Sequence, residues 1–173
     1  MPVPVFETTV LPHLDAAFNF ARWLTRNDAE AEDVVQDACV RALRYFSSFR
    51  HDDGRAWFFT IVRNTWYSRI SRRTSAMDAT PFDSRQDGPA DAAPNPEMRL
   101  LQRDTVGRVR QAIERLPVDF REVIVLREIE GLSYKEIATV ADVPIGTVMS
   151  RLARARERLL AQLQTVASVE TLP

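Results

Sequence analysis

Residues 132–163 constrain the fold of this chain more than any other segment. Ser133 is followed three residues later by Glu136, the spacing of a capping box at the start of a helix. Pro144 then interrupts the helical pattern, because proline lacks an amide donor and disfavours helix at the residue before it. An arginine-rich second helix begins near Thr147, which is placed to cap or open it. Two helices joined by such a tight turn indicate a helix-turn-helix, whose second helix enters the DNA major groove.

The second helix of this segment has two different faces when it is read at about 100° per residue. Small and polar side chains occupy the face opposite the apolar arc, with arginines at its edges. Such a face can enter a groove while the arginines reach phosphates or guanine edges. The alternative is a solvated helix whose arginines only maintain solubility, but cap, turn and two-faced pattern together favour DNA binding. The apolar arc expected to face the protein comprises Val148, Leu152, Ala155 and Leu159.

The composition favours an all-α protein, because there are only 5 glycines and few β-branched alternations. No apolar run approaches the ~20 residues that span a membrane, and the N-terminus lacks an export signal pattern. Cys39 is the only cysteine, which excludes an internal disulfide and suits a reducing cytoplasm. The sequence shows no Gly-rich phosphate loop, metal-ligand cluster or nucleophile–base pair. We therefore expect a cytoplasmic protein without catalytic residues, metal, cofactor or membrane insertion.

Charges of opposite sign are separated along the chain, although the formal net charge is only −1. Residues 28–37 hold five acidic side chains and no basic one. Residues 50–73 hold six arginines against Asp52 and Asp53. Separated signs indicate different partners on different faces. A mean charge near zero therefore does not exclude a nucleic-acid binder.

The chain is expected to form two small helical domains with a linker between them. The first domain covers residues 10–73, and Asp28 can cap its second helix. Residues 74–95 are acidic and rich in proline, so we expect a flexible linker. The second domain covers residues 96–165. The expected helices are 11–25, 28–46 and 55–73 in the first domain, and 97–116, 119–130, 133–141 and 147–165 in the second.

Residues 55–73 combine aromatic side chains with arginines and carry a second functional signal. Their broader apolar side is expected to pack in the core, with Phe59 at its boundary. A narrower arc contains Arg63, Asn64 and Tyr67, and such a mixture suits single-stranded nucleic acid, whose bases stack on aromatic rings. The apolar side comprises Trp57, Phe58, Ile61, Val62 and Trp66.

Three ordered motifs resemble those of bacterial RNA polymerase sigma factors of the sigma-70 family, in the extracytoplasmic-function group. They are DAEAEDVVQDACVRAL, GRAWFFTIVRN, and the region from LPVDFREVIVLREIEGLSYKEIA to VPIGTVMSRLARARERL. The resemblance covers most of the chain and fails only at the extreme N-terminus, the linker and the last residues. Three motifs at the expected separations are highly specific, whereas a lone helix-turn-helix would be a weak signal.

The resemblance implies a promoter-specificity factor that binds core RNA polymerase and promoter DNA and is restrained by an anti-sigma factor. The family's counterpart of the helix over 28–46 docks on the clamp helices of the largest polymerase subunit. A solvated acidic helix face is the alternative interpretation of this helix. The contacts implied for core polymerase are Asp33, Gln36, Asp37 and Arg41.

The loop before the third helix, and the helix itself, resemble the part of the family that recognises the promoter −10 element. There a base is extruded from the non-template strand, which costs a few kcal/mol that protein contacts must offset. The loop spelling RHDDGRA departs from the commoner RG(D/E)S type, which leaves the −10 sequence preference open. The implied contacts are Phe49, Arg50, His51, Asp52 and Asp53 for the extruded base, and Arg63, Asn64 and Tyr67 for neighbouring bases or phosphates.

The carboxy-terminal helix-turn-helix corresponds to the part of the family that reads the −35 element as duplex DNA. Met149 and Ala153 occupy groove-facing positions and are expected to tune sequence preference by shape or methyl contact. The other implied contacts are Thr147, Ser150, Arg151, Arg154 and Arg156.

Two other functions fit the sequence less well. A dimeric helix-turn-helix repressor or activator would bind duplex DNA without polymerase, but it leaves residues 28–73 unexplained. A protein-interaction module that imitates a sigma domain to sequester an anti-sigma factor would have lost the DNA-facing arginines, which are present. An enzyme is the least supported class.

Overall fold

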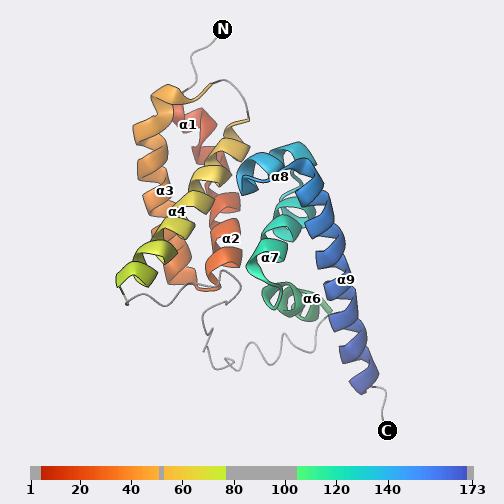
Figure 1. Ribbon diagram of the computed structural model, residues 1–173. Helices are drawn as coiled ribbons and strands as arrows, with labels where there is room; N and C mark the ends of the chain where they lie inside the picture. Colours follow the sequence, from red (N-terminus) through yellow and green to blue (C-terminus); the bar gives the residue numbers. More distant parts are fainter. Residues whose placement is uncertain (1–4, 51–52, 77–104, 171–173) are drawn as a thin grey trace.

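The computed structural model describes residues 5–50, 53–76 and 105–170. Every regular element in these ranges is helical, and the helices form two groups, α1–α4 and α6–α9 (Figure 1). The prediction of an all-α protein built from two helical parts, the second with a helix-turn-helix, is therefore confirmed. The predicted linker and the start of the first helix after it fall largely on residues 77–104, which lie outside the described ranges.

The amino-terminal half differs from the prediction mainly at its helix ends. Its first short helix was not predicted, and α4 runs three residues further than expected. The cap of α3 is Asn27 and not Asp28, because the Asn27 side chain accepts a hydrogen bond of 2.9 Å from the Glu30 amide. The elements are α1 (Phe6–Thr9), η1 (Leu11–His13), α2 (Leu14–Thr25), α3 (Asp28–Tyr45), η2 (Phe46–Ser48) and α4 (Gly54–Ala76).

The carboxy-terminal half contains the helix-turn-helix in its last two helices. The predicted helix over 119–130 is α-helical only in its first part and then becomes the π-helical turn η3. Helix α9 begins before Thr147, because the Pro144 carbonyl accepts hydrogen bonds from the amides of Thr147 and Val148. Thr147 therefore lies in the first turn and is not the cap. The elements are α6 (Thr105–Glu114), α7 (Val118–Ile124), η3 (Val125–Ile129), α8 (Tyr134–Ala141) and α9 (Ile145–Glu170).

The predicted capping box and turn of the helix-turn-helix are confirmed. The Ser133 hydroxyl accepts a hydrogen bond of 3.2 Å from the Glu136 amide, and the Glu136 carboxylate accepts one of 2.6 Å from the Ser133 amide. Helix α8 ends at Asp142, whose backbone is left-handed with φ of 53°. This short reversal places α9 against α8 and exposes its opposite face.

Buried apolar side chains from both halves form one continuous cluster. The predicted inner face of α9 is buried at Val148, Leu152 and Ala155. Phe59 is fully buried as well, in edge-to-face contact with Phe20, so it belongs to the core and not to its boundary. Tyr45, which the helical pattern places on the buried face of α3, is exposed, because α3 gives way to η2 at this point.

The two halves pack against each other directly in this structure. Helix α4 contacts α8, and α2 contacts α7 and η3. The amino-terminal half therefore lies on the α7 and α8 side of the second half, and α9 runs along the other side (Figure 1). Arg110 of α6 also lies over the ring of Trp23 in α2, 5.7 Å from its centroid. The packing therefore brings α4 next to the helix-turn-helix.

Candidate nucleic-acid interface

The outer face of α9 is the first of two candidate DNA-binding surfaces. Met149 is 54% exposed, and Ser150, Ala153 and Arg154 are exposed beside it. Because the opposite face of α9 is fixed in the core, these four side chains are held outward on a rigid element. Thr147 is half-buried, and its carbonyl accepts a hydrogen bond of 3.0 Å from the Ser150 hydroxyl. A helix with small residues on this face and arginines at its edges fits a major groove.

Two of the arginines at the edges of this face take part in ion pairs within the second half. Arg156 lies 2.6 Å from Glu128 of η3, and Arg151 lies 3.8 Å from Asp119 of α7. Both acidic partners are about half exposed, so water and salt screen these pairs. The arginines are thus oriented along the edges of α9 without being buried there.

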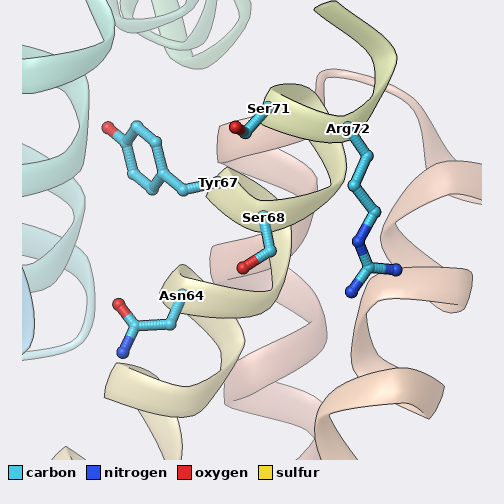
Figure 2. Close-up of a pocket in the computed structure, with 5 residues that line it drawn as sticks. All are labelled: Asn64, Tyr67, Ser68, Ser71 and Arg72. Atoms are coloured by element: carbon cyan, nitrogen blue, oxygen red, sulfur yellow. The ribbon is translucent and has the colours of Figure 1, made fainter. Parts of the chain in front are cut away.

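The second candidate surface lies on α4, where side chains one turn apart line an open hollow of about 510 Å³ (Figure 2). Asn64 and Tyr67 were predicted as DNA contacts, and the structure brings them together here. Ser68 and Arg72 also line it and were not predicted, although helical spacing from Asn64 would have found them. Asn64 is exposed, and Tyr67 is half-buried. The Tyr67 ring projects away from the axis of α4 (Figure 2). The remaining lining residue is Ser71.

A carboxyl group from the other half of the chain meets α4 at this surface. The Nε atom of Arg63 lies 2.8 Å from one oxygen of Glu122, and the Tyr67 hydroxyl donates a hydrogen bond of 3.3 Å to the other. Glu122 belongs to α7 and is 0% exposed, while the Arg63 side chain is 15% exposed. Two of the three predicted contacts on α4 are therefore engaged within the protein.

Burial governs the ionisation of this cluster. It raises the pKa of Glu122 to about 7, although the Arg63 guanidinium acts in the opposite direction. The pKa of Tyr67 is also raised, first by burial and then by the Glu122 charge, so the phenol stays a hydrogen-bond donor. A carboxyl with a pKa near neutrality is thus placed between the two halves of the chain.

The loop before α4 is only partly consistent with a base-binding pocket. Phe49 is 8% exposed, and its ring stacks on Phe46 and makes a tilted contact with Trp57, so it packs inside the protein. Arg50 is exposed, whereas His51 and Asp52 lie outside the described residues. The role of these four residues in base binding therefore stays a prediction, and Phe49 would have to leave its stack to perform it.

Asp53 immediately precedes α4 and also faces the second half. Its carboxylate accepts a hydrogen bond of 2.9 Å from the amide of Arg55, as in a helix cap. The pKa of Asp53 is lowered, first by a hydrogen bond with the Glu136 carboxyl and then by the amides at the start of α4. Arg55 donates a hydrogen bond of 3.1 Å to the Glu130 carbonyl at the end of η3. The start of α4 is thus attached to the helix-turn-helix half.

The predicted polymerase-binding face of α3 carries both charged and apolar exposed groups. Asp37 lies 2.6 Å and Asp33 3.8 Å from the guanidinium of Arg69 in α4, and both carboxylates remain more than half exposed. Gln36 is exposed and Arg41 half-buried on the same helix. Apolar groups also lie open on α3, at Val40 (59% exposed) and Leu43 (62% exposed). Leu43 was not predicted from the sequence, and it lies one helical turn from Val40, so the two exposed apolar side chains are neighbours on α3.

Neither a metal site nor a membrane segment is found in the part of the chain that the structure describes. No group of three or more His, Cys, Asp or Glu side chains in these ranges is arranged to hold a metal ion. None of the described helices combines the length and apolar composition needed to cross a membrane.

Comparison with known proteins matches each half of the chain to a family model. The family model for sigma-70 region 2 matches residues 9–76, and that for sigma-70 region 4 matches residues 107–159. The RNA polymerase sigma-H factor of Pseudomonas aeruginosa is 35% identical over 166 residues, which cover 92% of this chain and 86% of that protein. The chain belongs to the sigma-70 family of sigma factors.

Its relatives place this sigma factor in the extracytoplasmic-function group. The ECF RNA polymerase sigma-E factor of Escherichia coli K12 is 38% identical over 144 residues, covering 78% of this chain and 74% of the relative. The family consists of transcription initiation factors and not of enzymes. The resemblance stated from the three sequence motifs is therefore confirmed.

Two solved structures resemble both halves of the chain together. The sigma factor RpoE of Bartonella quintana, solved in complex with the anti-sigma factor NepR, is 32% identical with a TM-score of 0.70. That match covers 92% of this chain and 96% of RpoE. CnrH, solved with the cytosolic domain of CnrY, is 29% identical with a TM-score of 0.65, and the match covers 92% of this chain and 88% of CnrH.

Proposed function

We propose that this sigma factor binds core RNA polymerase and directs it to promoters by reading two DNA elements with separate helices. The observation that carries the proposal is that one chain presents an exposed, arginine-edged face on α9 and a polar face on α4. These faces lie in the halves that match region 4 and region 2. We assign residues 96–165 to the −35 domain, residues 10–73 to the −10 and polymerase-binding domain, and residues 74–95 to the linker.

Recognition of the −35 element is assigned to duplex DNA in contact with α9. Arg154 is exposed in the middle of the face and is the candidate for a base contact. Arginine can donate two hydrogen bonds to one guanine, at O6 and N7. Arg151 and Arg156 at the edges would bind phosphates and exchange their acidic partners for them. Met149 and Ala153 would contact thymine methyl groups, and Thr147 and Ser150 complete the face.

Opening of the −10 element is assigned to α4 and the loop before it. Single-stranded bases can stack on an aromatic ring and bind amide and arginine side chains, which Tyr67, Asn64 and Arg63 provide. The protein has no need of a catalytic group for this step. Stronger binding to the melted strand than to the duplex shifts the equilibrium toward open DNA.

Polymerase binding is assigned to the outer face of α3. Val40 and Leu43 are exposed apolar side chains that polymerase would bury on binding. The nearby carboxylates of Asp33 and Asp37 would favour a partner surface with positive charge. Gln36 and Arg41 would extend this contact. Because polymerase and promoter DNA occupy the cytoplasm, we place the sigma factor there as well.

Control by an anti-sigma factor is the remaining part of the proposal. The whole chain, and not one half alone, resembles RpoE solved with NepR and CnrH solved with CnrY. This likeness supports control of this sigma factor by an anti-sigma factor.

The test is formation of a stable promoter complex by purified core polymerase. Mixed with a library of genomic promoter fragments, the polymerase should retain a specific subset in heparin-resistant complexes only when the sigma factor is present. Leu43→Asp should abolish this retention while leaving binding of duplex DNA by the free protein unchanged. Retention of the same fragments without the sigma factor would overturn the proposal.

A further inference from the structure

We propose that three apolar side chains along one edge of α9 select promoters whose −35 element carries thymines, because these side chains bury the 5-methyl groups of those bases. The three are Ile145, Met149 and Ala153, and together they are called the apolar row. Ile145 has no role in the contacts assigned above, and it is the first residue of α9. The inference rests on the function proposed above for α9 and names the chemistry of the bases that this helix selects.

The apolar row is a continuous strip on the helix surface. Its members are four residues apart, so their side chains follow one another on the same side of α9 at successive turns. Successive members are about 6 Å apart along the helix axis, which is about two base-pair steps of duplex DNA. Ile145 is 45% and Met149 54% exposed, and Ala153 is exposed as well. The strip is therefore long enough to meet the edges of several neighbouring base pairs.

The exposure of Ile145 follows from the turn before it. The Pro144 carbonyl accepts hydrogen bonds from the amides of Thr147 and Val148, so α9 starts immediately after the proline. Gly146 has no side chain, and nothing lies within 4 Å of the place where its Cβ would be. The first turn of α9 can therefore approach a groove closely, with an isoleucine at its leading end. Residues at this end of a recognition helix are the ones that contact base edges.

A second row on the same helix carries the hydrogen-bonding groups. Thr147, Ser150 and Arg154 follow one another on the other side of the outer face of α9. Thymine is distinguished in the major groove by its methyl group, whereas guanine offers two acceptors to an arginine. An apolar side chain gains free energy by burying a methyl group, but against another base edge it would leave polar atoms unsatisfied. The apolar row is therefore suited to thymine, and the polar row to guanine.

The surroundings of the apolar row favour DNA as its occupant over another protein. Arg156 continues the same edge of α9 and is 49% exposed, and Arg154 is exposed next to Ala153. Phosphates flank the groove of a duplex, so positive side chains beside a short apolar strip complement it. A strip of three side chains is also too small to form a stable protein interface.

The experiment removes the methyl groups from the DNA and leaves the rest of the complex unchanged. A promoter fragment retained by the complete polymerase–sigma complex is synthesised again with deoxyuridine in place of every thymidine of its −35 element. Uracil pairs with adenine as thymine does and lacks only the 5-methyl group. A control fragment carries the same number of deoxyuridines in the spacer between the two elements. Competition for the complex measures the affinity of each fragment.

The wild-type complex is expected to bind the fragment with −35 uracils about threefold more weakly for each methyl group that the apolar row buries. Uracils in the spacer should leave its affinity unchanged. Ile145→Ala and Met149→Ala should each bind the thymine fragment more weakly and lose part of the discrimination against −35 uracils. Leu160→Ala removes an exposed leucine further along α9 and is the matched control, which should keep the wild-type ratio.

Equal affinity of the wild-type complex for the thymine fragment and the −35 uracil fragment would overturn the proposal. Retained promoters without thymine in their −35 elements would overturn it too. Full discrimination in a variant carrying both Ile145→Ala and Met149→Ala would also overturn it, because the methyl groups would then be bound elsewhere. These results leave the function proposed for α9 intact if Arg154→Ala still alters the −35 preference. Failure of the wild-type complex to retain any specific fragment would instead overturn that function.

Discussion

The Nη2 atom of Arg156 lies 2.6 Å from Oε1 of Glu128, so an ion pair joins helix α9 to η3. Both side chains are about half exposed, and such pairs contribute at most about 1 kcal/mol. Arg156 must leave Glu128 to bind a phosphate. We therefore expect Glu128→Gln to tighten binding of duplex −35 DNA by about two- to fivefold at low salt. Titration of a labelled promoter duplex measures this, with Glu7→Gln as the control, and weaker binding would show that Glu128 positions Arg156 for DNA.

Arg154 is the exposed arginine in the middle of the α9 face, and its removal should affect sequence recognition more than charge. Arg154→Ala is expected to weaken specific −35 binding by about 1–3 kcal/mol and to relax preference at one base pair. Competition between selected and scrambled duplexes measures both effects. Arg115→Ala, at an exposed position outside α9, is the control. An equal loss on both duplexes would mean that Arg154 contacts only phosphate.

Asn64 is exposed on α4 beside the hollow of Figure 2, so its loss should impair DNA opening alone. Asn64→Ala is expected to leave duplex binding intact and to reduce open-complex formation. Permanganate reactivity of thymines in the −10 region, measured with core polymerase, reports the opening. A template with a pre-melted −10 region should partly rescue the variant if the defect lies in melting. Unchanged reactivity on duplex promoters would remove Asn64 from the site.

Glu122 should make the separation of the two halves depend on pH. Its pKa is about 7 in the contact with Arg63 and Tyr67 because of burial, and it should return toward the ordinary 4.5 once the halves separate and water reaches it. The closed state therefore binds the proton more tightly. Its stabilisation is complete below about pH 4.5 and is lost as the pH rises through 7. The groups that face Glu122 are Arg63, Tyr67, Asp119 and Arg151.

Dyes are attached to the two halves at the exposed positions Glu32→Cys and Leu160→Cys, with Cys39→Ser to leave no other thiol. The measurement is energy transfer between these dyes from about pH 5 to about pH 8. Transfer should fall as the pH rises, and Glu122→Gln, which imitates the neutral carboxyl, should remove most of this dependence. Transfer that rises with pH would mean that the closed state binds the proton less tightly than the open state, contrary to the expected linkage. Glu7→Gln should keep the wild-type profile.

Gly54 and Gly146 give opposite predictions for stability. A methyl group at Gly54 would lie 2.7 Å from the Thr9 side chain and 2.9 Å from its carbonyl oxygen, so α1 or α4 must shift. Gly54→Ala is expected to cost about 1–3 kcal/mol of the free energy of unfolding. At Gly146 nothing lies within 4 Å, and Gly146→Ala should stabilise α9 by about 0.4–1 kcal/mol. Urea denaturation of both variants measures the difference, and equal effects would contradict the close approach of α1.

Features that depend on neighbouring residues were predictable from the sequence. The capping box at Ser133 and Glu136, the turn at Pro144 and the buried arc of α9 follow from hydrogen-bonding capacity and helical period. The prediction of the α3 cap was wrong because two neighbouring residues could both cap that helix. Asn27 and Asp28 are both good caps, and only the fold decides that Asn27 accepts the hydrogen bond.

Features that depend on distant residues were not predictable in this way. Glu122 and Arg63 are 59 positions apart, and no periodic pattern marks a glutamate within α7 as the partner of α4. Phe49 has the residue type of a base contact, but packing against Phe46 and Trp57 buries its ring. The sequence thus indicates which side chains can bind DNA, while the packing of the two halves determines which of them are free to do so.

Run-off transcription with purified core polymerase tests the central claim most directly. On a pool of linear genomic fragments, the wild-type sigma factor should direct initiation from a defined set of start sites that share upstream −35 and −10 sequences. Arg154→Ala should shift the −35 preference of that set, and Asn64→Ala should reduce its yield. Transcripts with no defined start sites, or the same start sites from core polymerase alone, would contradict the account.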